Sequence, residues 1–176
     1  MIIIEGPDNV GKDTQIKKIQ KYFYEKYKEP LVKVHCSYFG INDPELALEE
    51  YIRISELDLI YSIIANRLHI GELVYGPLYR NYSDKEIERV LEFEKIFLKD
   101  SILFIFIDNP KNLIKRDDGQ SFSINLEKKQ KEIALFKKAY ELSNIKNKFL
   151  INIEDKNEND VFEIVKYFLE RVKLWL

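Results

Sequence analysis

The first fourteen residues place a short apolar strand directly before a glycine-rich loop and a lysine. Ile2, Ile3 and Ile4 form a β-branched run that is typical of a buried strand. Residues 6–12 have the spacing Gly-x-x-x-x-Gly-Lys, and apolar residues then recur at helical intervals through residues 12–28. Glycines let successive N–H groups turn towards an anion, and the helix N-terminus adds a partial positive charge. The pattern predicts a phosphate-binding P-loop, and the structural alternative is a turn with an exposed lysine.

The residue types of this loop predict how a nucleoside triphosphate binds. We expect Lys12 to place its charge beside the β- and γ-phosphates. The other predicted cofactor-binding residues are Gly6, Asn9, Val10, Gly11, Asp13 and Thr14. Asp13 stands where Ser or Thr usually follows the lysine, and a carboxylate is also a hard oxygen ligand for Mg²⁺. We therefore predict ATP and Mg²⁺ as cofactors, with Asp13 and Thr14 as the metal-binding residues.

The bulk composition indicates a globular chain without a general affinity for polyanions. The 176 residues suffice for one domain, 1–176, with a sizeable core, and 45% of them are hydrophobic. A formal net charge of −2 lowers the expectation of binding to nucleic acid or to a membrane surface. Cys36 is the only cysteine, so no intramolecular disulfide forms. The opening apolar run is too short for a signal peptide or a membrane span, and we expect a cytoplasmic protein.

Apolar runs alternate with helical patterns along the rest of the chain. Strands are expected at 2–5, 31–36, 60–65, 101–107 and 148–153. Helices are expected at 12–28, 44–60, 83–99, 126–143 and 159–175, and a polar lid at about 109–125. The alternation predicts an α/β fold with a five-stranded parallel sheet. Strands that are apolar almost throughout predict helices on both faces, which gives the three-layer α/β/α sandwich of P-loop NTPases.

A second group of polar side chains follows the third expected strand. Ligands of parallel sheets bind beyond the carboxyl ends of the strands, where these residues fall. The predicted substrate-binding residues here are Arg67, His69, Glu72, Tyr75 and Arg80. Two arginines suit a second phosphate because each offers paired planar donors. The alternatives are that the arginines pair with acids such as Glu72 and Asp84, and that the histidine and the tyrosine are packed side chains. The pair Gly76-Pro77 predicts a turn.

The segment after the fourth expected strand, residues 108–116, is rich in basic side chains. Phosphoryl transfer needs positive charge that arrives as the site closes over both substrates. We predict this role for Arg116, because a guanidinium can span the donor and the transferred group. Lys111 and Lys115 are expected to be solvated.

These motifs resemble those of the thymidylate kinase-like branch of P-loop nucleoside monophosphate kinases. The resemblance covers nearly the whole length and rests on E-G-P-D-N-V-G-K-D-T, on N-R followed by Tyr75 and Arg80, on D-N-P-K-N-L-I-K-R, and on I-N-I-E-D before the last helix. It implies that Asp8 lies near the acceptor sugar, that Arg67 contacts the acceptor phosphate and that Arg116 is the lid arginine. It also implies a possible homodimer.

The sequence departs from that family's pattern at Asn66, after the second strand, and in a lid that is poor in arginine. Asn66 stands where the family usually has a carboxylate, and Asp13 is expected to compensate, as in some viral deoxynucleotide kinases that carry Gly-Lys-Asp-Thr. The family's Arg-Glu-Pro after the second strand is replaced by residues 35–39, H-C-S-Y-F. The segment G-E-L-V-Y-G-P-L-Y-R is similar to phage-encoded relatives, some of which phosphorylate 5-hydroxymethyluracil in DNA.

The sequence therefore predicts an ATP-dependent phosphotransferase that converts a deoxynucleoside monophosphate, a dTMP-like pyrimidine nucleotide, to the diphosphate. The candidate catalytic residues are Lys12, Arg67 and Arg116. One alternative is a kinase acting on a hydroxyl of a nucleoside or of 5-hydroxymethyluracil in DNA, with His35, Glu72, His69 or Asp8 as the base. Another is a nucleotide-binding switch without transfer. Plausible contacts for the acceptor base are Tyr38, Phe39, Tyr51 and Arg53.

Overall fold

The computed structural model describes residues 1–36, 43–119, 121 and 123–172, and this part of the chain contains five strands and seven helices. The strands are β1 (Ile2–Glu5), β2 (Val32–His35), β3 (Ile63–Asn66), β4 (Ile102–Ile107) and β5 (Asn147–Asn152). The helices are α1 (Lys12–Tyr27), α2 (Pro44–Leu57), α3 (Ile70–Tyr79), α4 (Asp84–Phe97), α5 (Pro110–Lys115), α6 (Leu126–Leu142) and α7 (Glu158–Arg171). None of the helices in the described ranges is long and apolar enough to cross a membrane.

The five strands form one parallel sheet in the order β2-β3-β1-β4-β5. The central strand β1 pairs with β3, where Ile4 lies opposite Asn66, and with β4, where Glu5 lies opposite Ile105. Because all strands run in the same direction, their carboxyl ends meet at one edge of the sheet. The residues that follow β1, β2, β3 and β4 are thereby brought together.

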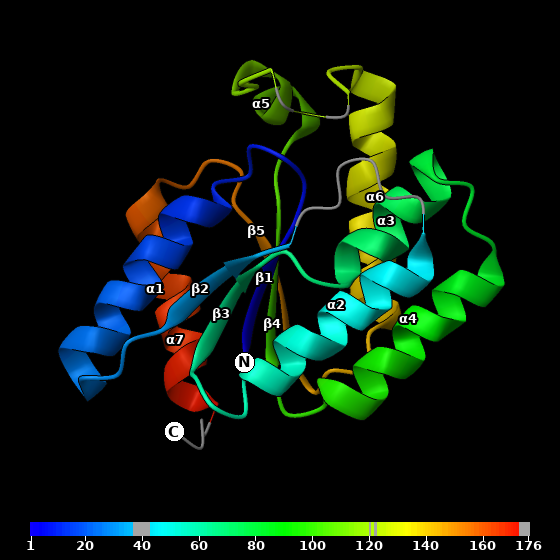
Figure 1. Ribbon diagram of the computed structural model, residues 1–176. Coiled ribbons are helices and arrows are strands. Elements are labelled where there is room, and N and C mark those ends of the chain that lie inside the picture. The colour runs from blue at the N-terminus through cyan, green and yellow to red at the C-terminus, as the bar shows by residue number, and fades with distance from the viewer. Residues whose placement is uncertain (37–42, 120, 122, 173–176) are drawn as a thin grey trace.

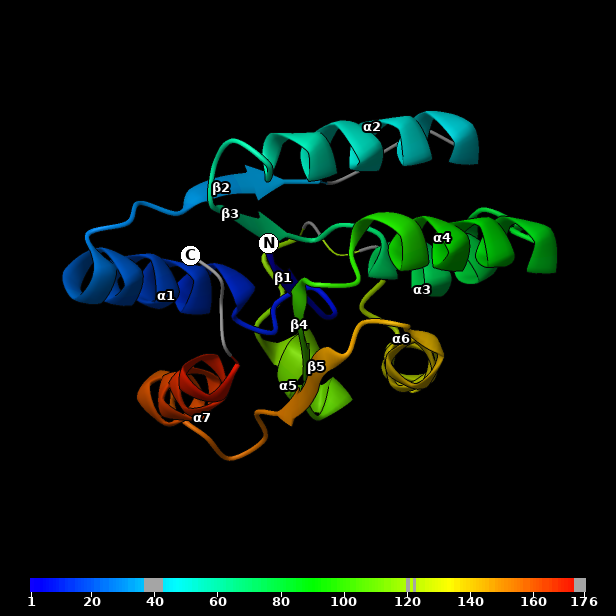
Figure 2. The same cartoon turned by 90° about the horizontal axis from the view of Figure 1, so that it is seen from below.

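Helices cover both faces of this sheet and produce three layers. Helices α1 and α7 contact each other on one face, and α2, α3, α4 and α6 cover the other (Figures 1 and 2). Helix α5 lies beyond the carboxyl ends of the strands, above the loop that joins β1 to α1 in Figure 1. The predicted α/β class, the five-stranded parallel sheet and the sandwich are confirmed.

The core lies along the central strands and explains why their sequences are apolar throughout. Ile3, Ile4, Phe104 and Ile105 have no exposed surface. Strands covered by helices on both faces have no solvent side, so an alternating pattern would bury polar groups without partners.

Two predicted helix starts are confirmed in atomic detail. Asp43 Oδ1 accepts a hydrogen bond from the backbone N of Glu45 at 2.9 Å, and Pro44 is the first residue of α2. Ser83 and Glu86 form a capping box at the start of α4, which was predicted to begin at 83. Local side-chain chemistry fixes these two ends, so the sequence is sufficient to locate them.

The region between residues 58 and 80 differs from the sequence prediction. Strand β3 begins at Ile63 rather than at 60, because the chain first turns after α2 and the side chains of Leu59 and Ile60 are exposed. The predicted turn at Gly76-Pro77 is wrong, since both residues belong to α3. Pro77 has no N–H to donate to the carbonyl four residues earlier, so α3 lacks that one hydrogen bond, and the helix ends two residues later at Tyr79.

Two further boundaries differ from the prediction. The polar segment 109–125 contains the short helix α5, which Asn109 caps by accepting a hydrogen bond from the backbone N of Lys111 at 3.0 Å. Six residues are too few for an apolar periodicity to show in the sequence. The last helix ends at Arg171, and the predicted continuation to Trp175 lies outside the described residues.

Candidate functional site

Gly6 begins the loop between β1 and α1 and allows it to pass close to the neighbouring strand. Its φ of 138° is one that residues with a Cβ rarely adopt. A Cβ at this position would lie 2.4 Å from the carbonyl oxygen of Phe106 in β4. Val10, which is 1% exposed, packs beneath the loop, and Gly11, with φ 83°, is the N-cap of α1. The backbone therefore wraps around the start of α1 as a phosphate-binding loop requires.

Lys12 is the buried cation at the centre of this loop. Its side chain is 7% exposed, and Nζ donates hydrogen bonds to the carbonyl oxygens of Gly6 at 3.0 Å and Pro7 at 2.7 Å. Burial, together with the charge of Arg67, lowers the pKa of Lys12 to about 7. A phosphate beside Nζ would favour the charged form and reverse this shift. The site therefore couples the charge state of Lys12 to anion binding.

Asp13, in the first turn of α1, is held by two donors from neighbouring strands. Lys33 Nζ of β2 lies 2.5 Å from Asp13 Oδ1, and the side-chain amide of Asn66 at the end of β3 donates to the same oxygen at 3.1 Å. Burial raises the pKa of Asp13, but the hydrogen bond and charge of Lys33 outweigh it, so the net pKa is lowered. Asp13 is therefore a carboxylate at neutral pH.

The oxygen atoms at the start of α1 fit a magnesium ion bound mainly by phosphates and water. The Asp13 side chain is 61% exposed and Thr14, the next residue, is half-buried in the same turn. No group of three or more His, Cys, Asp or Glu side chains with metal-binding geometry occurs among the described residues. A site with one carboxylate and one hydroxyl matches the way proteins hold Mg²⁺ on nucleotides, with few protein ligands.

Arg67 follows β3 and contacts the loop that joins β1 to α1. It adopts a left-handed backbone conformation with φ 68°, and Glu5 Oε1 accepts a hydrogen bond from the next backbone N, that of Leu68, at 2.7 Å. The guanidinium donates to the Gly6 carbonyl at 3.2 Å, forms an ion pair with Asp8 and lies 5.6 Å from the centre of the Tyr75 ring. The predicted residues Asp8, Arg67 and Tyr75 are thus brought together beside Lys12.

Glu72 and Arg80 lie at the two ends of α3 and form an ion pair that is almost buried. Glu72 Oε1 also accepts a hydrogen bond from the Tyr51 hydroxyl of α2 at 2.9 Å. The position of Arg80 matches the alternative in which this arginine pairs with an acid such as Glu72. This cluster joins α3 to α2 and stiffens the element next to Arg67.

His69 is placed in the interior, away from the P-loop. Its side chain has no exposed surface, and Nε2 lies 2.8 Å from Glu94 Oε1 of α4. The same carboxylate accepts hydrogen bonds from the Ser143 hydroxyl and the backbone N of Asn144. The geometry matches the alternative of a packed histidine, and we do not retain His69 in the proposed acceptor site.

The segment after α5 contacts the P-loop through Asn9. The Asn9 amide donates to Asp117 Oδ1 and to Ser121 Oγ, each at 3.1 Å. Arg116 instead pairs with Asp108 at the end of β4, and its Nε donates to the Asn112 carbonyl at 3.1 Å. The predicted lid therefore meets the loop, while its arginine is held at the carboxyl end of β4.

The sequence did not single out several side chains that contact these residues. Lys33 holds Asp13, Glu5 holds the chain beside Arg67, and Asp117 contacts Asn9. One signal pointed to Lys33: it alternates with His35 in the second strand, so both lie on the same face of it. Among the predicted base contacts, Tyr51 is buried and Arg53 is exposed with ion pairs to Glu49 and Glu50. Tyr38 and Phe39 lie outside the described residues.

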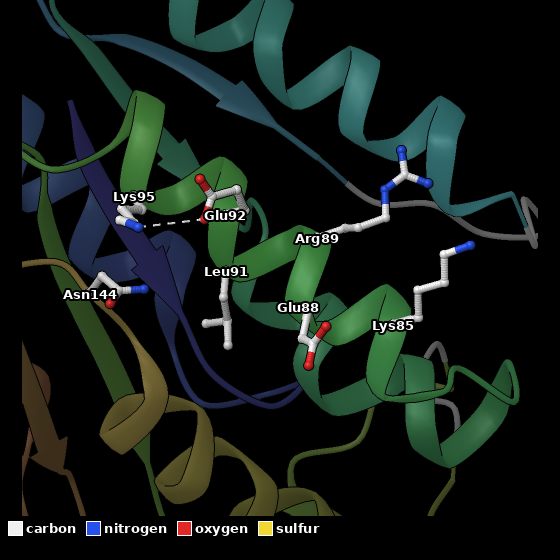
Figure 3. Close-up of a pocket in the computed structure, with 7 residues that line it drawn as sticks. All are labelled: Lys85, Glu88, Arg89, Leu91, Glu92, Lys95 and Asn144. Atoms are coloured by element: carbon white, nitrogen blue, oxygen red, sulfur yellow. Dashed lines mark ion pairs between the residues drawn. The ribbon is translucent and has the colours of Figure 1, made fainter.

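A separate surface groove of about 550 Å³ runs along α4 (Figure 3). It is lined by Lys85, Glu88, Arg89, Leu91, Glu92, Lys95 and Asn144. Lys95 forms an ion pair with Glu92 at 3.7 Å, and Arg89 forms an ion pair with Glu45 of α2. Interleaved opposite charges of this kind are typical of a solvated helix face. The groove contains none of the predicted site residues, and we assign no chemistry to it.

Comparison with known proteins yields likeness in structure and none in sequence. No protein-family model matches the chain, and no curated protein does. The YorR protein from Bacillus subtilis, solved in complex with phosphorylated GDP, superposes with a TM-score of 0.72 and 18% identity over 96% of this chain and 95% of that one. Thymidylate kinase from Candida albicans superposes with a TM-score of 0.62 and 14% identity over 97% and 90%. At these identities the likeness establishes the fold, and the chain has the P-loop α/β/α sandwich of thymidylate kinase.

Proposed function

We propose that this protein is an ATP-dependent phosphotransferase that phosphorylates a deoxynucleoside monophosphate of the dTMP type. The observation that carries the proposal is the position of two basic side chains at one place. Lys12 lies within the P-loop, and Arg67 lies across the same loop, where both reach the Gly6 carbonyl. A phosphoryl transferase needs a cation for the donor and another for the acceptor. The fold shared with thymidylate kinase supports this reading.

On the donor side, the backbone N–H groups of the loop and the start of α1 would cradle the β- and γ-phosphates of ATP. Lys12 would offset the charge that develops on the transferring group. Asp13 and Thr14 would hold Mg²⁺, which neutralises phosphate charge when it is bound. Losing Lys12 should cost about 10²–10³ in rate, by analogy with removal of one transition-state donor. Catalysis is then positioning together with electrostatic stabilisation.

On the acceptor side, Arg67 would hold the phosphate and Asp8 would lie near the sugar. A phosphate acceptor is already ionised, so it needs no strong general base. We propose that Arg116, the residue before Asp117 in the segment that contacts the P-loop, leaves Asp108 and joins the transferred group. Glu72 and Arg80 would support α3 rather than contact the nucleotide. We also propose that residues 109–125 close over the site as a lid and that the protein forms a homodimer.

A hydroxyl acceptor, on a nucleoside or on 5-hydroxymethyluracil in DNA, is the second candidate because of His35. This residue ends β2 opposite Asn66 and lies within electrostatic reach of Arg67 and Asp13. Burial and the charge of Arg67 lower its pKa below the ordinary value, which favours the neutral imidazole that a general base requires. A hydroxyl acceptor predicts that His35→Gln abolishes turnover, whereas a phosphate acceptor predicts a small effect.

An ATP-consumption assay with Mg²⁺ and a panel of acceptors tests the proposal. The panel contains dTMP, dUMP, 5-hydroxymethyl-dUMP, dCMP, dGMP, thymidine, and duplex DNA with and without 5-hydroxymethyluracil. We expect turnover with a pyrimidine monophosphate that Lys12→Ala abolishes. Lys21→Ala is the matched control, because Lys21 is an exposed lysine of α1 that pairs with Glu25. Turnover with thymidine or modified DNA alone would favour the second candidate, and ATP binding with no turnover would favour a switch.

A further inference from the structure

Lys33 is an edge-strand residue whose charge reaches the start of α1. Its Nζ lies 2.5 Å from Asp13 Oδ1, although the two residues are 20 positions apart in sequence. The Lys33 side chain is 36% exposed and that of Asp13 is 61% exposed, so the pair lies at the protein surface. Unlike the exposed pairs within single helices, this contact joins β2 to the residue that follows the P-loop lysine.

Asn66 completes the surroundings of the same carboxylate oxygen. Its side-chain amide donates to Asp13 Oδ1 at 3.1 Å, and Asn66 itself is 1% exposed. An amide at this position can donate to a carboxylate, whereas an aspartate there would repel it. Asp13 therefore faces one cationic and one neutral donor, and the three side chains carry no net charge as a group.

A carboxylate directly after the P-loop lysine poses an electrostatic problem for nucleotide binding. The polyphosphate would lie over the first turn of α1, where Asp13 adds a negative charge that Ser or Thr would not. Magnesium can relieve this repulsion once it is bound by Asp13. Without metal, Lys33 is the cation in direct contact with the Asp13 carboxylate.

We propose that Lys33 is a phosphate-binding determinant of this P-loop, whose charge cancels that of Asp13 and lets metal-free nucleotide bind. The inference rests on the proposed function, because it requires a nucleotide in the loop. Lys33 would then offset the charge of Asp13 in the absence of metal, and Mg²⁺ would offset it when bound. Lys33 matters most without metal, and its removal is partly offset when Mg²⁺ occupies Asp13.

Isothermal titration with ADP, in EDTA and in Mg²⁺, tests this role without relying on turnover. We expect Lys33→Met to weaken ADP binding in EDTA about tenfold, because the negative charge of Asp13 is then uncompensated near the phosphates. The same variant should weaken ADP binding less in Mg²⁺. Asp13→Ser alone should tighten binding in EDTA, and the double variant Asp13→Ser/Lys33→Met should return to near the wild-type affinity. Lys21→Met controls for the loss of one positive charge, since Lys21 pairs with Glu25 on the exposed side of α1.

The outcomes separate this inference from the proposed function. If the wild-type protein binds ADP and Lys33→Met binds it with the same affinity in EDTA, the role of Lys33 is overturned and the proposed function stands. No binding by the wild-type protein in either condition would overturn both. If Lys33→Met does not fold, Asp13→Ser still decides the matter: unchanged or weaker ADP binding in EDTA would contradict the inference.

Discussion

Nucleotide binding should be coupled to proton uptake by Lys12. Burial and the nearby charge of Arg67 lower the pKa of this lysine to about 7 in the free protein. At pH 8 only about one tenth of the molecules then carry a charge on Lys12. A phosphate placed beside Nζ favours the ammonium form, so the pKa rises when nucleotide binds.

The size of the effect follows from these two states. If the bound form is fully charged at pH 8, binding takes up about 0.9 proton at that pH and about 0.1 at pH 6. The affinity for ADP should therefore fall by up to about tenfold per pH unit above pH 7. A lysine with the ordinary pKa of 10.5 would give almost no uptake in the same range.

Calorimetric titration with ADP in two buffers of different ionisation enthalpy measures the protons exchanged. Lys12→Met is the control, because proton exchange by ADP itself remains in this variant and can be subtracted. Proton uptake near zero when the wild-type protein binds ADP at pH 8 would refute this reasoning.

The lowered pKa of Lys12 also affects stability. Between pH 7 and 10.5 the unfolded chain binds more protons than the folded one, so Lys12 makes the free energy of unfolding rise with pH in that window.

Three substitutions test other parts of the account. Arg67→Ala should raise KM for the acceptor about 10- to 100-fold, because it removes charged hydrogen bonds to a phosphate, while Arg171→Ala, an exposed arginine of α7, should leave KM unchanged; equal effects would contradict the assignment. Glu94→Ala should lower the free energy of unfolding by about 3–5 kcal/mol in denaturant titrations, since it leaves buried donors of His69 and Ser143 without a partner. Burial raises the pKa of Glu94, but His69 and the other donors lower it on balance, so its contribution is present above pH 4.5 and should be lost as the pH falls below that value; a loss already complete at neutral pH would be inconsistent with this. Phe136→Ala should cost about 3–5 kcal/mol by removing a fully buried ring of α6, measured the same way, and a change below 1 kcal/mol would mean that the core is not packed as described.

The elements of this fold that have strong local signals could be predicted from the sequence. The Gly-x-x-x-x-Gly-Lys spacing located the P-loop, and buried runs such as Ile102–Ile107 located the central strands. The cap of α2 at Asp43 was predictable because a side chain and two following backbone groups suffice to form it. In each case the physical cause lies within a few residues of the feature.

Features that depend on tertiary contacts could not be predicted in this way. Helix α3 includes Gly76 and Pro77, and its burial between neighbouring helices outweighs their local preference for a turn. His69 carries a titratable ring, yet Glu94, 25 residues away, determines its environment. Arg116 pairs with Asp108 because α5 folds back over the end of β4.

The candidate site shows the same division. Asp8, Lys12 and Arg67 follow strands that pair, so the sequence was sufficient to bring them together. Lys33 lies on an edge strand whose neighbours in space become known only with the sheet order β2-β3-β1-β4-β5. Its contact with Asp13 requires β2 to lie beside α1, which no motif encodes.

In the proposed reaction, ATP bound in the P-loop donates its γ-phosphoryl group to a second nucleotide. Phosphorus NMR of a mixture of the protein, ATP, Mg²⁺ and dTMP follows every phosphate in one experiment. The account predicts that ADP and a new nucleoside diphosphate appear in equal amounts, with no free phosphate, and that neither forms with Lys12→Ala. Release of inorganic phosphate without a second diphosphate, or unchanged ATP in the presence of every monophosphate tried, would contradict it.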